Sequence, residues 1–173
     1  MPRNIEIKAR TDSVESLLTR AQAVAESAPE IIHQDDTFFR VPNGRLKLRE
    51  FADGSAELIH YHRPDHGEAK ASDYVRVAVP DASALREALA RGCGLLGRVR
   101  KERLLLLVSE GGFQTRVHID RVENLGDFME LEVVLQDGQS DADGAAEAER
   151  LMAALGLHNA QRLTGSYLDL LQR

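Results

Sequence analysis

The fold of this chain is decided by two stretches, RVHID (residues 116–120) and GDFMELE (residues 126–132). Charged and apolar residues alternate within the first stretch and along the second half of the other. Residues two apart on a β-strand point to the same face, so this alternation predicts two strands, each with one charged and one apolar face. The short connection between them, which contains Asn124-Leu125-Gly126, predicts that the strands are antiparallel neighbours.

The same period of two occurs along much of the chain and predicts about eight strands. Short turns such as Pro42-Asn43-Gly44 and Ala52-Asp53-Gly54 favour antiparallel hairpins, whereas residues 63–68 are predicted to form a loop. The predicted strands cover residues 3–10, 31–41, 44–51, 55–63, 72–79, 98–108, 113–120 and 127–136.

Helical periodicity occurs between these strands and after the last one. Asp12 is predicted to cap a helix to about Ala25, with Glu15 as its capping-box partner. Other helices are predicted from Asp81 to about Arg91, ended by Gly92, Gly94 and Gly97, from Ser140 to about Leu155, ended by Gly156, and over residues 164–172.

Length and composition predict one soluble domain over residues 1–173. The chain is 43% hydrophobic, which suffices for a core, and its net charge of −6 argues against general binding to nucleic acid or anionic membranes. The single Cys93 excludes an internal disulfide and a multi-thiolate zinc site. The opening MPRNIEIKAR is too charged for a signal peptide, and we expect a cytoplasmic protein.

The charged faces of the predicted strands are net basic although the whole chain is acidic. They carry nine basic and five acidic residues, which leaves 13 basic and 23 acidic residues elsewhere. One interpretation is the ordinary wet face of an antiparallel sheet. The other is a site that attracts a compact polyanion. The residues are Lys8, Arg45, Lys47, Arg49, Arg63, Arg76, Lys101, Arg103 and Arg116, against Glu6, Glu57, Asp120, Glu130 and Glu132.

The residue types suit a polyphosphate bound with a metal ion. Arginine contacts phosphate through two hydrogen bonds and lysine adds a point charge. Carboxylates close to a phosphate need a divalent cation between them, and carboxylate oxygens are ligands that Mg²⁺ and Mn²⁺ accept.

Six blocks, in order, give the chain a family resemblance over nearly its whole length. The sequence resembles the CYTH domain, or triphosphate tunnel metalloenzymes, which include class IV adenylyl cyclases, thiamine triphosphatases and inorganic tripolyphosphatases. The tail at residues 166–171 also resembles that of the class IV cyclases. The blocks are Asn4-Ile5-Glu6-Ile7-Lys8, Gln34-Asp35-Asp36-Thr37-Phe38-Phe39, Arg45-Leu46-Lys47-Leu48-Arg49-Glu50, Lys101-Glu102-Arg103, Arg116-Val117-His118-Ile119-Asp120 and Gly126-Asp127-Phe128-Met129-Glu130-Leu131-Glu132.

The resemblance implies an α+β fold, a closed antiparallel eight-stranded β-barrel whose charged lumen forms a tunnel, with flanking helices over the apolar outer faces. It also implies the roles of the charged residues. Mg²⁺ or Mn²⁺ is expected to bind to Glu6, Asp120, Glu130 and Glu132, and the triphosphate to Lys8, Lys47, Arg49, Arg63, Lys101, Arg103 and Arg116.

Catalysis is assigned to Glu6 and Lys8. Lys8 either activates the nucleophile, because a desolvated lysine among cations has a lowered pKa, or simply binds phosphate. The first glutamate of the family's Glu-x-Glu-x-Lys motif is Asn4 here, which weakens or removes one of two metal positions. Asp36 is expected in the site or at a turn or edge, and His118 either lines the tunnel or is an ordinary hydrogen-bonded histidine.

The implied substrate is a small-molecule triphosphate, and a homodimer is possible because family members are often dimers. The Gly126-Asp127-Phe128 block and the tail favour cyclisation of ATP to cyclic AMP and pyrophosphate. The alternatives are hydrolysis of tripolyphosphate, thiamine triphosphate or another organic triphosphate, and a non-catalytic nucleotide or polyphosphate sensor. Alanine at Lys47, Arg49 or Arg103 is expected to abolish substrate binding but spare folding, because charge repulsion is relieved.

Overall fold

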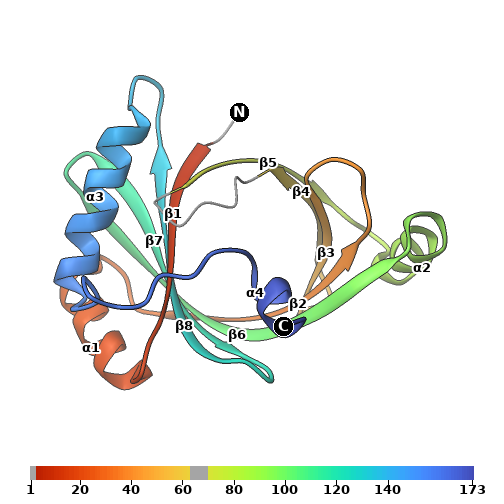
Figure 1. Cartoon of the computed structure of the whole chain (residues 1–173), viewed down its shortest axis with the longest axis horizontal. Coiled ribbons are helices and arrows are strands. Elements are labelled where there is room, and N and C mark those ends of the chain that lie inside the picture. The colour runs from red at the N-terminus through yellow and green to blue at the C-terminus, as the bar shows by residue number, and fades with distance from the viewer. Residues whose placement is uncertain (1–2, 63–69) are drawn as a thin grey trace.

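Eight antiparallel strands close into a barrel in the computed structural model, which describes residues 3–62 and 70–173 (Figure 1). The order around the barrel is β1-β5-β4-β3-β2-β6-β7-β8, and β8 pairs with β1, which confirms the expected fold. The predicted loop at 63–68, with Arg63, lies outside the described residues. The strands are β1 (Arg3–Arg10), β2 (Glu30–Phe39), β3 (Arg45–Phe51), β4 (Ala56–His62), β5 (Lys70–Ala78), β6 (Leu95–Glu110), β7 (Phe113–Val122) and β8 (Gly126–Leu135).

The register places the charged rows on one wall of the lumen. Glu132 lies opposite Glu6 on β1 and opposite Arg116 on β7, and Glu130 lies opposite Lys8 and His118. Since alternate residues point to opposite faces, this register turns the apolar residues of the same strands outward.

The outward apolar faces are covered by helices α1 (Val14–Val24), α2 (Ala82–Cys93) and α3 (Asp141–Ala154). Helices α1 and α3 pack against β1, β6, β7 and β8, whereas α2 packs over β2, β3 and β4 on the other side of the barrel (Figure 1). Gly144 permits the close approach of α3, because a Cβ there would lie 2.6 Å from Leu135 and 2.8 Å from Ile5. The core is therefore in the layer between helices and barrel, while the lumen is polar.

The short helix α4 (Tyr167–Leu171) packs across one end of the barrel rather than on its outer wall. Tyr167 and Leu168 contact the inward residues Phe38, Val99 and Phe128. The C-terminal helix thereby lies across part of one end of the lumen (Figure 1).

Two local expectations are corrected. The cap of α1 is Ser13, whose hydroxyl accepts a hydrogen bond from the Ser16 amide at 3.1 Å, so the helix begins one residue later than a cap at Asp12 would allow. Gly97 lies inside β6 instead of ending α2, which stops at Gly94. Gly97 is kept for packing rather than for ending the helix. A Cβ at this position of β6 would lie 2.4 Å from Leu168, so glycine permits the close approach of α4.

None of the helices among the described residues has the length and apolar character needed to cross a membrane.

Candidate functional site

The lumen contains a cavity of about 300 Å³ that receives side chains from all eight strands and from α4. It brings together nine of the residues that the sequence predicted for the site. Arg63 lies outside the described residues, and Asp120, although buried in the same barrel, is not among the residues that line the cavity. The nine are Glu6, Lys8, Lys47, Arg49, Lys101, Arg103, Arg116, Glu130 and Glu132.

Three cations surround the buried carboxylate of Asp36. Arg49 donates two hydrogen bonds of 2.7 Å to it, Lys47 donates one of 3.0 Å, and the Lys101 ammonium lies 3.9 Å away. Burial alone would raise the pKa of Asp36, but Arg49 and Lys47 outweigh it and hold this pKa well below its ordinary value. Asp36 is thus an internal anion in a place where the cations could hold phosphate.

The lysines of this group have lowered pKa values. Burial and the adjacent Arg49 lower the pKa of Lys47 from 10.5 to about 8. Burial and Arg103 lower the pKa of Lys101 well below its ordinary value. An anionic ligand in the lumen would favour the charged form of both.

Arg103 lies at the centre of a second buried network. It donates two hydrogen bonds of 2.7 Å to Asp120 and one of 2.9 Å to Glu130. The hydroxyl of Tyr167 donates another to Asp120 at 2.7 Å. Both oxygens of Asp120 are therefore engaged within the protein, so its contacts support positioning of Arg103 rather than the expected metal ligation.

Lys8 extends into the same network from β1. Its ammonium lies 3.7 Å from Glu130 and 4.2 Å from the centre of the Tyr167 ring. Both contacts suit a cation that binds phosphate. Its role in activating the nucleophile stays a prediction.

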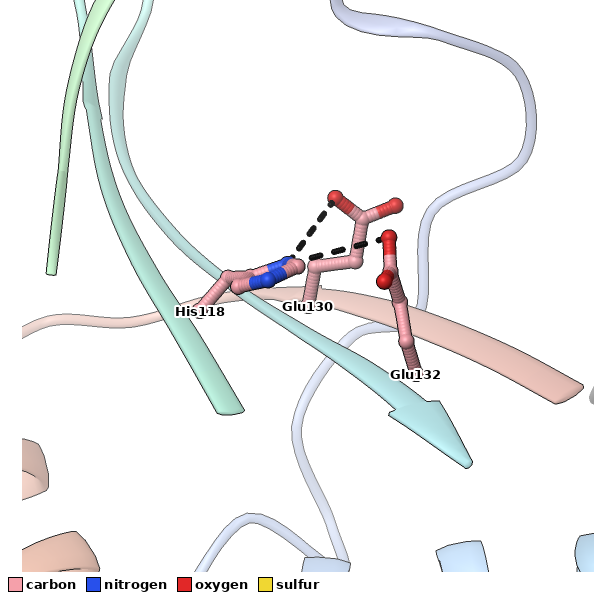
Figure 2. Close-up of side chains that lie close together, drawn as sticks. All are labelled: His118, Glu130 and Glu132. Carbon is pink, nitrogen blue, oxygen red and sulfur yellow. Dashed lines mark ion pairs between the residues drawn. The ribbon is translucent and has the colours of Figure 1, made fainter. Parts of the chain in front are cut away.

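His118, Glu130 and Glu132 form a cluster that fits a divalent metal ion (Figure 2). One ligand atom of each lies within 4.8 Å of those of the other two. The Nδ1 atom of His118 faces Glu132 at 3.8 Å and Glu130 at 4.0 Å. Burial and Arg103 lower the pKa of His118 to about 4, so the imidazole is neutral at neutral pH, as a metal ligand must be.

The Glu-x-Glu-x-Lys block continues the same wall. Glu6 lies opposite Glu132 in the register and lines the cavity, as expected of a metal-binding carboxylate. Asn4 also lines the cavity and is buried, and its Oδ1 atom has no hydrogen-bond partner among the described residues.

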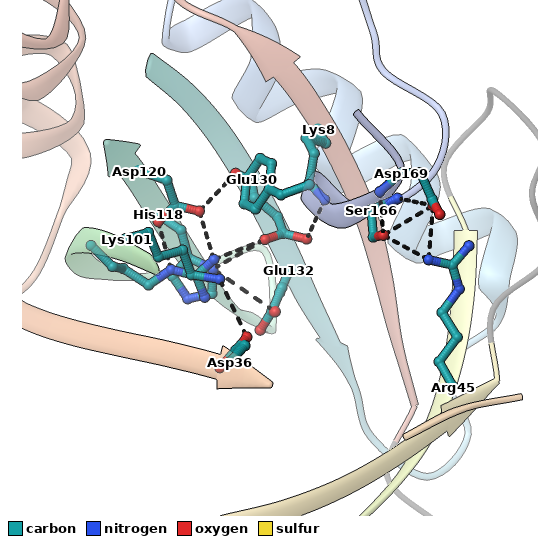
Figure 3. A network of polar contacts seen from close by, with 12 residues as sticks. Lys8, Asp36, Arg45, Lys101, His118, Asp120, Glu130, Glu132, Ser166 and Asp169 are labelled. Atoms are coloured by element: carbon teal, nitrogen blue, oxygen red, sulfur yellow. Dashed lines mark hydrogen bonds and ion pairs between the residues drawn. The ribbon is translucent and has the colours of Figure 1, made fainter. Parts of the chain in front are cut away.

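A network at the α4 end of the lumen includes residues that the sequence did not single out. Arg45 donates to Ser166 at 2.7 Å and to Asp169 at 2.8 Å, which ties α4 to β3 (Figure 3). Ser166 and Asp169 form a capping box at the start of α4, so the helix predicted over residues 164–172 is present but shorter, from Tyr167 to Leu171. Tyr167 reaches the lumen only because α4 folds back across the barrel end.

Apolar side chains line part of the cavity on β2, β3 and β6, where Leu105 lies opposite His118 in the β6–β7 register. Ile32, Phe51 and Leu105 line it, each partly exposed to the lumen. Gln34 is buried directly opposite Phe51 in the β2–β3 register, and its Oε1 atom has no hydrogen-bond partner among the described residues. This part of the lumen offers apolar surface next to the carboxamide of Gln34.

The sequence model of the CYTH domain matches residues 2–167, so the chain belongs to the CYTH domain family. No curated protein sequence matches it. Among solved structures it is similar to the PH1012 protein of Pyrococcus horikoshii OT3, with a TM-score of 0.82 and 22% identity over 96% of this chain and 98% of that one.

Two further structures share the fold. A putative adenylate cyclase from Vibrio parahaemolyticus has a TM-score of 0.72 and 21% identity, over 98% of both chains. The putative adenylyl cyclase HpAC1 from Hippeastrum has a TM-score of 0.64 and 15% identity, over 89% of this chain and 88% of that one. At these identities the similarity concerns the fold.

Proposed function

We propose that this chain is a divalent-metal-dependent enzyme that acts on a small-molecule triphosphate inside the barrel. One observation carries the proposal. The same cavity contains a group of cations gathered around Asp36 and the cluster of His118, Glu130 and Glu132. Cations packed this closely repel one another, and a polyphosphate offers several negative charges along one chain.

The chain's own residues supply positioning and charge. Arg49, Arg116 and Lys47 would bind phosphate oxygens and stabilise the negative charge that develops on the leaving phosphate. A divalent ion bound at Glu130, Glu132 and His118 would add positive charge next to those oxygens. The position of α4 across one barrel end reduces the access of bulk water from that side of the site.

The first candidate reaction is cyclisation of ATP. The ribose 3′-oxygen would lose its proton and bond to the α-phosphorus, the bond from the α-phosphorus to the bridging oxygen would break, and pyrophosphate would leave. The apolar part of the lumen supports a substrate that carries an organic group, because Ile32 and Phe51 offer apolar contact. The carboxamide of Gln34 has the donor and acceptor pattern that matches the N6 and N7 edge of adenine.

The second candidate is hydrolysis, in which the oxygen of a water bonds to the terminal phosphorus while the bond from that phosphorus to the bridging oxygen breaks. The remaining diphosphate leaves, and the water's proton is lost to give orthophosphate. The Hippeastrum protein favours keeping this candidate, since the published description of that structure reports a dominant triphosphatase activity for a putative adenylyl cyclase. Hydrolysis needs only the phosphate-binding part of the lumen and makes no use of Gln34.

The test is a product assay with ATP, thiamine triphosphate and tripolyphosphate, each with Mg²⁺ or Mn²⁺. Cyclic AMP with pyrophosphate supports the cyclase, and orthophosphate supports the hydrolase. We expect Arg116→Ala to lose most activity and Arg98→Ala, which removes an outer-face arginine paired with Asp35, to retain it. Tight binding without turnover of any substrate would overturn the enzymatic proposal in favour of a sensor.

Gln34→Leu separates a nucleotide substrate from an inorganic one. It is expected to raise KM for ATP while leaving the turnover of tripolyphosphate nearly unchanged. An equal loss with both substrates would remove the argument for an adenine contact.

A further inference from the structure

We propose that His118 is a metal ligand and that, through it, the lumen binds Mn²⁺ in preference to Mg²⁺. The inference deepens the proposed function and rests on it for the presence of a divalent ion. It concerns the ligand set, which was expected from the sequence to be carboxylates alone.

The position of His118 is the first argument. Its side chain is only 5% exposed, and Nδ1 has no hydrogen-bond partner among the described residues. A buried polar atom left without a partner costs about 1–3 kcal/mol, so such atoms in proteins usually have a ligand, a water or a function. The separations of 3.8 and 4.0 Å from Glu132 and Glu130 exceed hydrogen-bond length, so the carboxylates themselves do not satisfy this atom.

The carboxylates are already oriented toward His118. Arg116 lies 3.3 Å from Oε2 of Glu132, which leaves Oε1 facing the imidazole. Arg103 holds Glu130 in place by donating at 2.9 Å to Oε2, which is also the oxygen that faces His118, so Oε2 would be shared between Arg103 and the ion. Side chains that hold the ligating residues in place by hydrogen bonds or ion pairs, as Arg103 and Arg116 do here, are typical of metal sites.

The local charge can accept a divalent ion. The acidic residues of this wall are Glu6, Asp120, Glu130 and Glu132, and the cations in contact with them are Lys8, Arg103 and Arg116. The acids outnumber these cations, and a bound triphosphate would add further negative charge.

Two positions that the family resemblance assigns to metal binding offer weaker ligands here, so an imidazole would complete the ligand set. Asp120 is engaged by Arg103 and Tyr167, and Asn4 is neutral where the family motif has a glutamate. A nitrogen ligand changes the preference for metal ions. Mg²⁺ favours all-oxygen coordination, whereas mixed nitrogen and oxygen sites bind divalent first-row transition metals, and Mn²⁺ is the one of these that shares the preference of Mg²⁺ for carboxylate oxygens.

The experiment measures Mn²⁺ binding to the full chain without triphosphate, by calorimetry and by pulsed electron paramagnetic resonance. Coupling of the bound Mn²⁺ to a nitrogen nucleus is expected, and it should change when the protein is labelled with ¹⁵N at histidine alone. His118→Gln is expected to weaken Mn²⁺ binding by at least about tenfold and Mg²⁺ binding much less.

His33→Gln is the matched control, because His33 also has a glutamate, Glu102, 4.0 Å from its Nδ1 atom, but on the exposed surface. It should bind both metals as the wild type does. Absence of nitrogen coupling in the wild-type protein, or equal Mn²⁺ affinity of His118→Gln and His33→Gln, would overturn the proposal.

The labelled wild-type protein keeps the test valid even if His118→Gln does not fold. The two proposals also fail separately. Nitrogen-coupled Mn²⁺ in a protein that turns over no triphosphate would contradict the enzymatic function alone, and turnover without nitrogen coupling would contradict the role of His118 alone.

Discussion

Replacing Asp36 by asparagine is the sharpest test of whether this carboxylate neutralises the cations of the lumen. The change keeps the side-chain size but removes the negative charge that Arg49, Lys47 and Lys101 share at 2.7–3.9 Å. Removing one partner of a buried ion pair costs about 3–5 kcal/mol. For a domain of this length each kcal/mol lowers Tm by about 2–4 °C, so Asp36→Asn should melt about 6–20 °C below the wild type.

The assay is calorimetric unfolding at neutral pH with and without tripolyphosphate. Asp36 and phosphate compete for the same cations, so Asp36→Asn should bind tripolyphosphate more tightly and gain more stability from a given concentration. A ligand at 100 times its Kd stabilises the folded state by about 2.7 kcal/mol. The control is Asp35→Asn, which removes the neighbouring carboxylate that pairs with Arg98 and Arg100 outside the barrel. Such exposed pairs contribute at most about 1 kcal/mol.

The pH dependence gives a second readout. The folded pKa of Asp36 is lowered, so its stabilising effect is complete above the ordinary pKa of 3.8 and is lost as the pH falls through the lower folded value. The difference in Tm between wild type and Asp36→Asn should therefore persist from neutral pH to about pH 4 and become smaller only in stronger acid. Equal melting of Asp36→Asn and Asp35→Asn, or no preferential stabilisation by tripolyphosphate, would refute the role of Asp36 as the internal counterion.

Three further changes test other parts of the structure. The pKa of Lys47 is lowered to about 8 by burial and a neighbouring arginine, so the free protein loses this charge as the pH rises through 8 and triphosphate binding should restore it. Calorimetric titration at pH 8.5 in two buffers of different ionisation enthalpy should show proton uptake that is smaller in Lys47→Arg. Gly97→Val should clash with Leu168, displace the C-terminal helix and cost about 1–3 kcal/mol, seen as earlier proteolysis of the tail. Tyr167→Phe removes a hydrogen bond to Asp120 and should lower the free energy of unfolding in urea by about 1.5–3 kcal/mol.

The strands and the sharing of one face by their charged residues could be predicted because both depend on local pattern, whereas the roles of the site residues came from the family resemblance. Alternation along residues 116–120 fixed which side chains share a face, and the register then placed Arg116 next to Glu132 and His118 next to Glu130. The helix caps Asp81 and Ser140 were also correctly located, since capping depends on residues three apart.

The expected effect of alanine substitutions changes once the partners are known. The sequence predicted that Arg49→Ala and Arg103→Ala would spare folding by relieving repulsion. In the structure each arginine makes two hydrogen bonds to a buried aspartate, Asp36 or Asp120, so its loss would leave a buried carboxylate without its main partner. The balance between repulsion and pairing depends on side-chain contacts across paired strands, Arg49 with Asp36 between β3 and β2 and Arg103 with Asp120 between β6 and β7, which the alternation within one strand does not reveal.

The sequence by itself determined the alternating strands, the caps and the accumulation of basic residues on one set of faces, because each follows from residues within a few positions of one another. The tertiary structure alone decided that those faces turn inward and that Asp36 and Asp120 neutralise particular arginines. It also decided that Tyr167 lies at one end of the lumen and that the buried Nδ1 of His118 faces two glutamates. The pairing of β1 with β8 and the tie between β3 and α4 join segments more than a hundred residues apart, which no local periodicity encodes. The contacts of Asp36, Asp120 and His118 join neighbouring strands, but they depend on the register between those strands and on side-chain geometry.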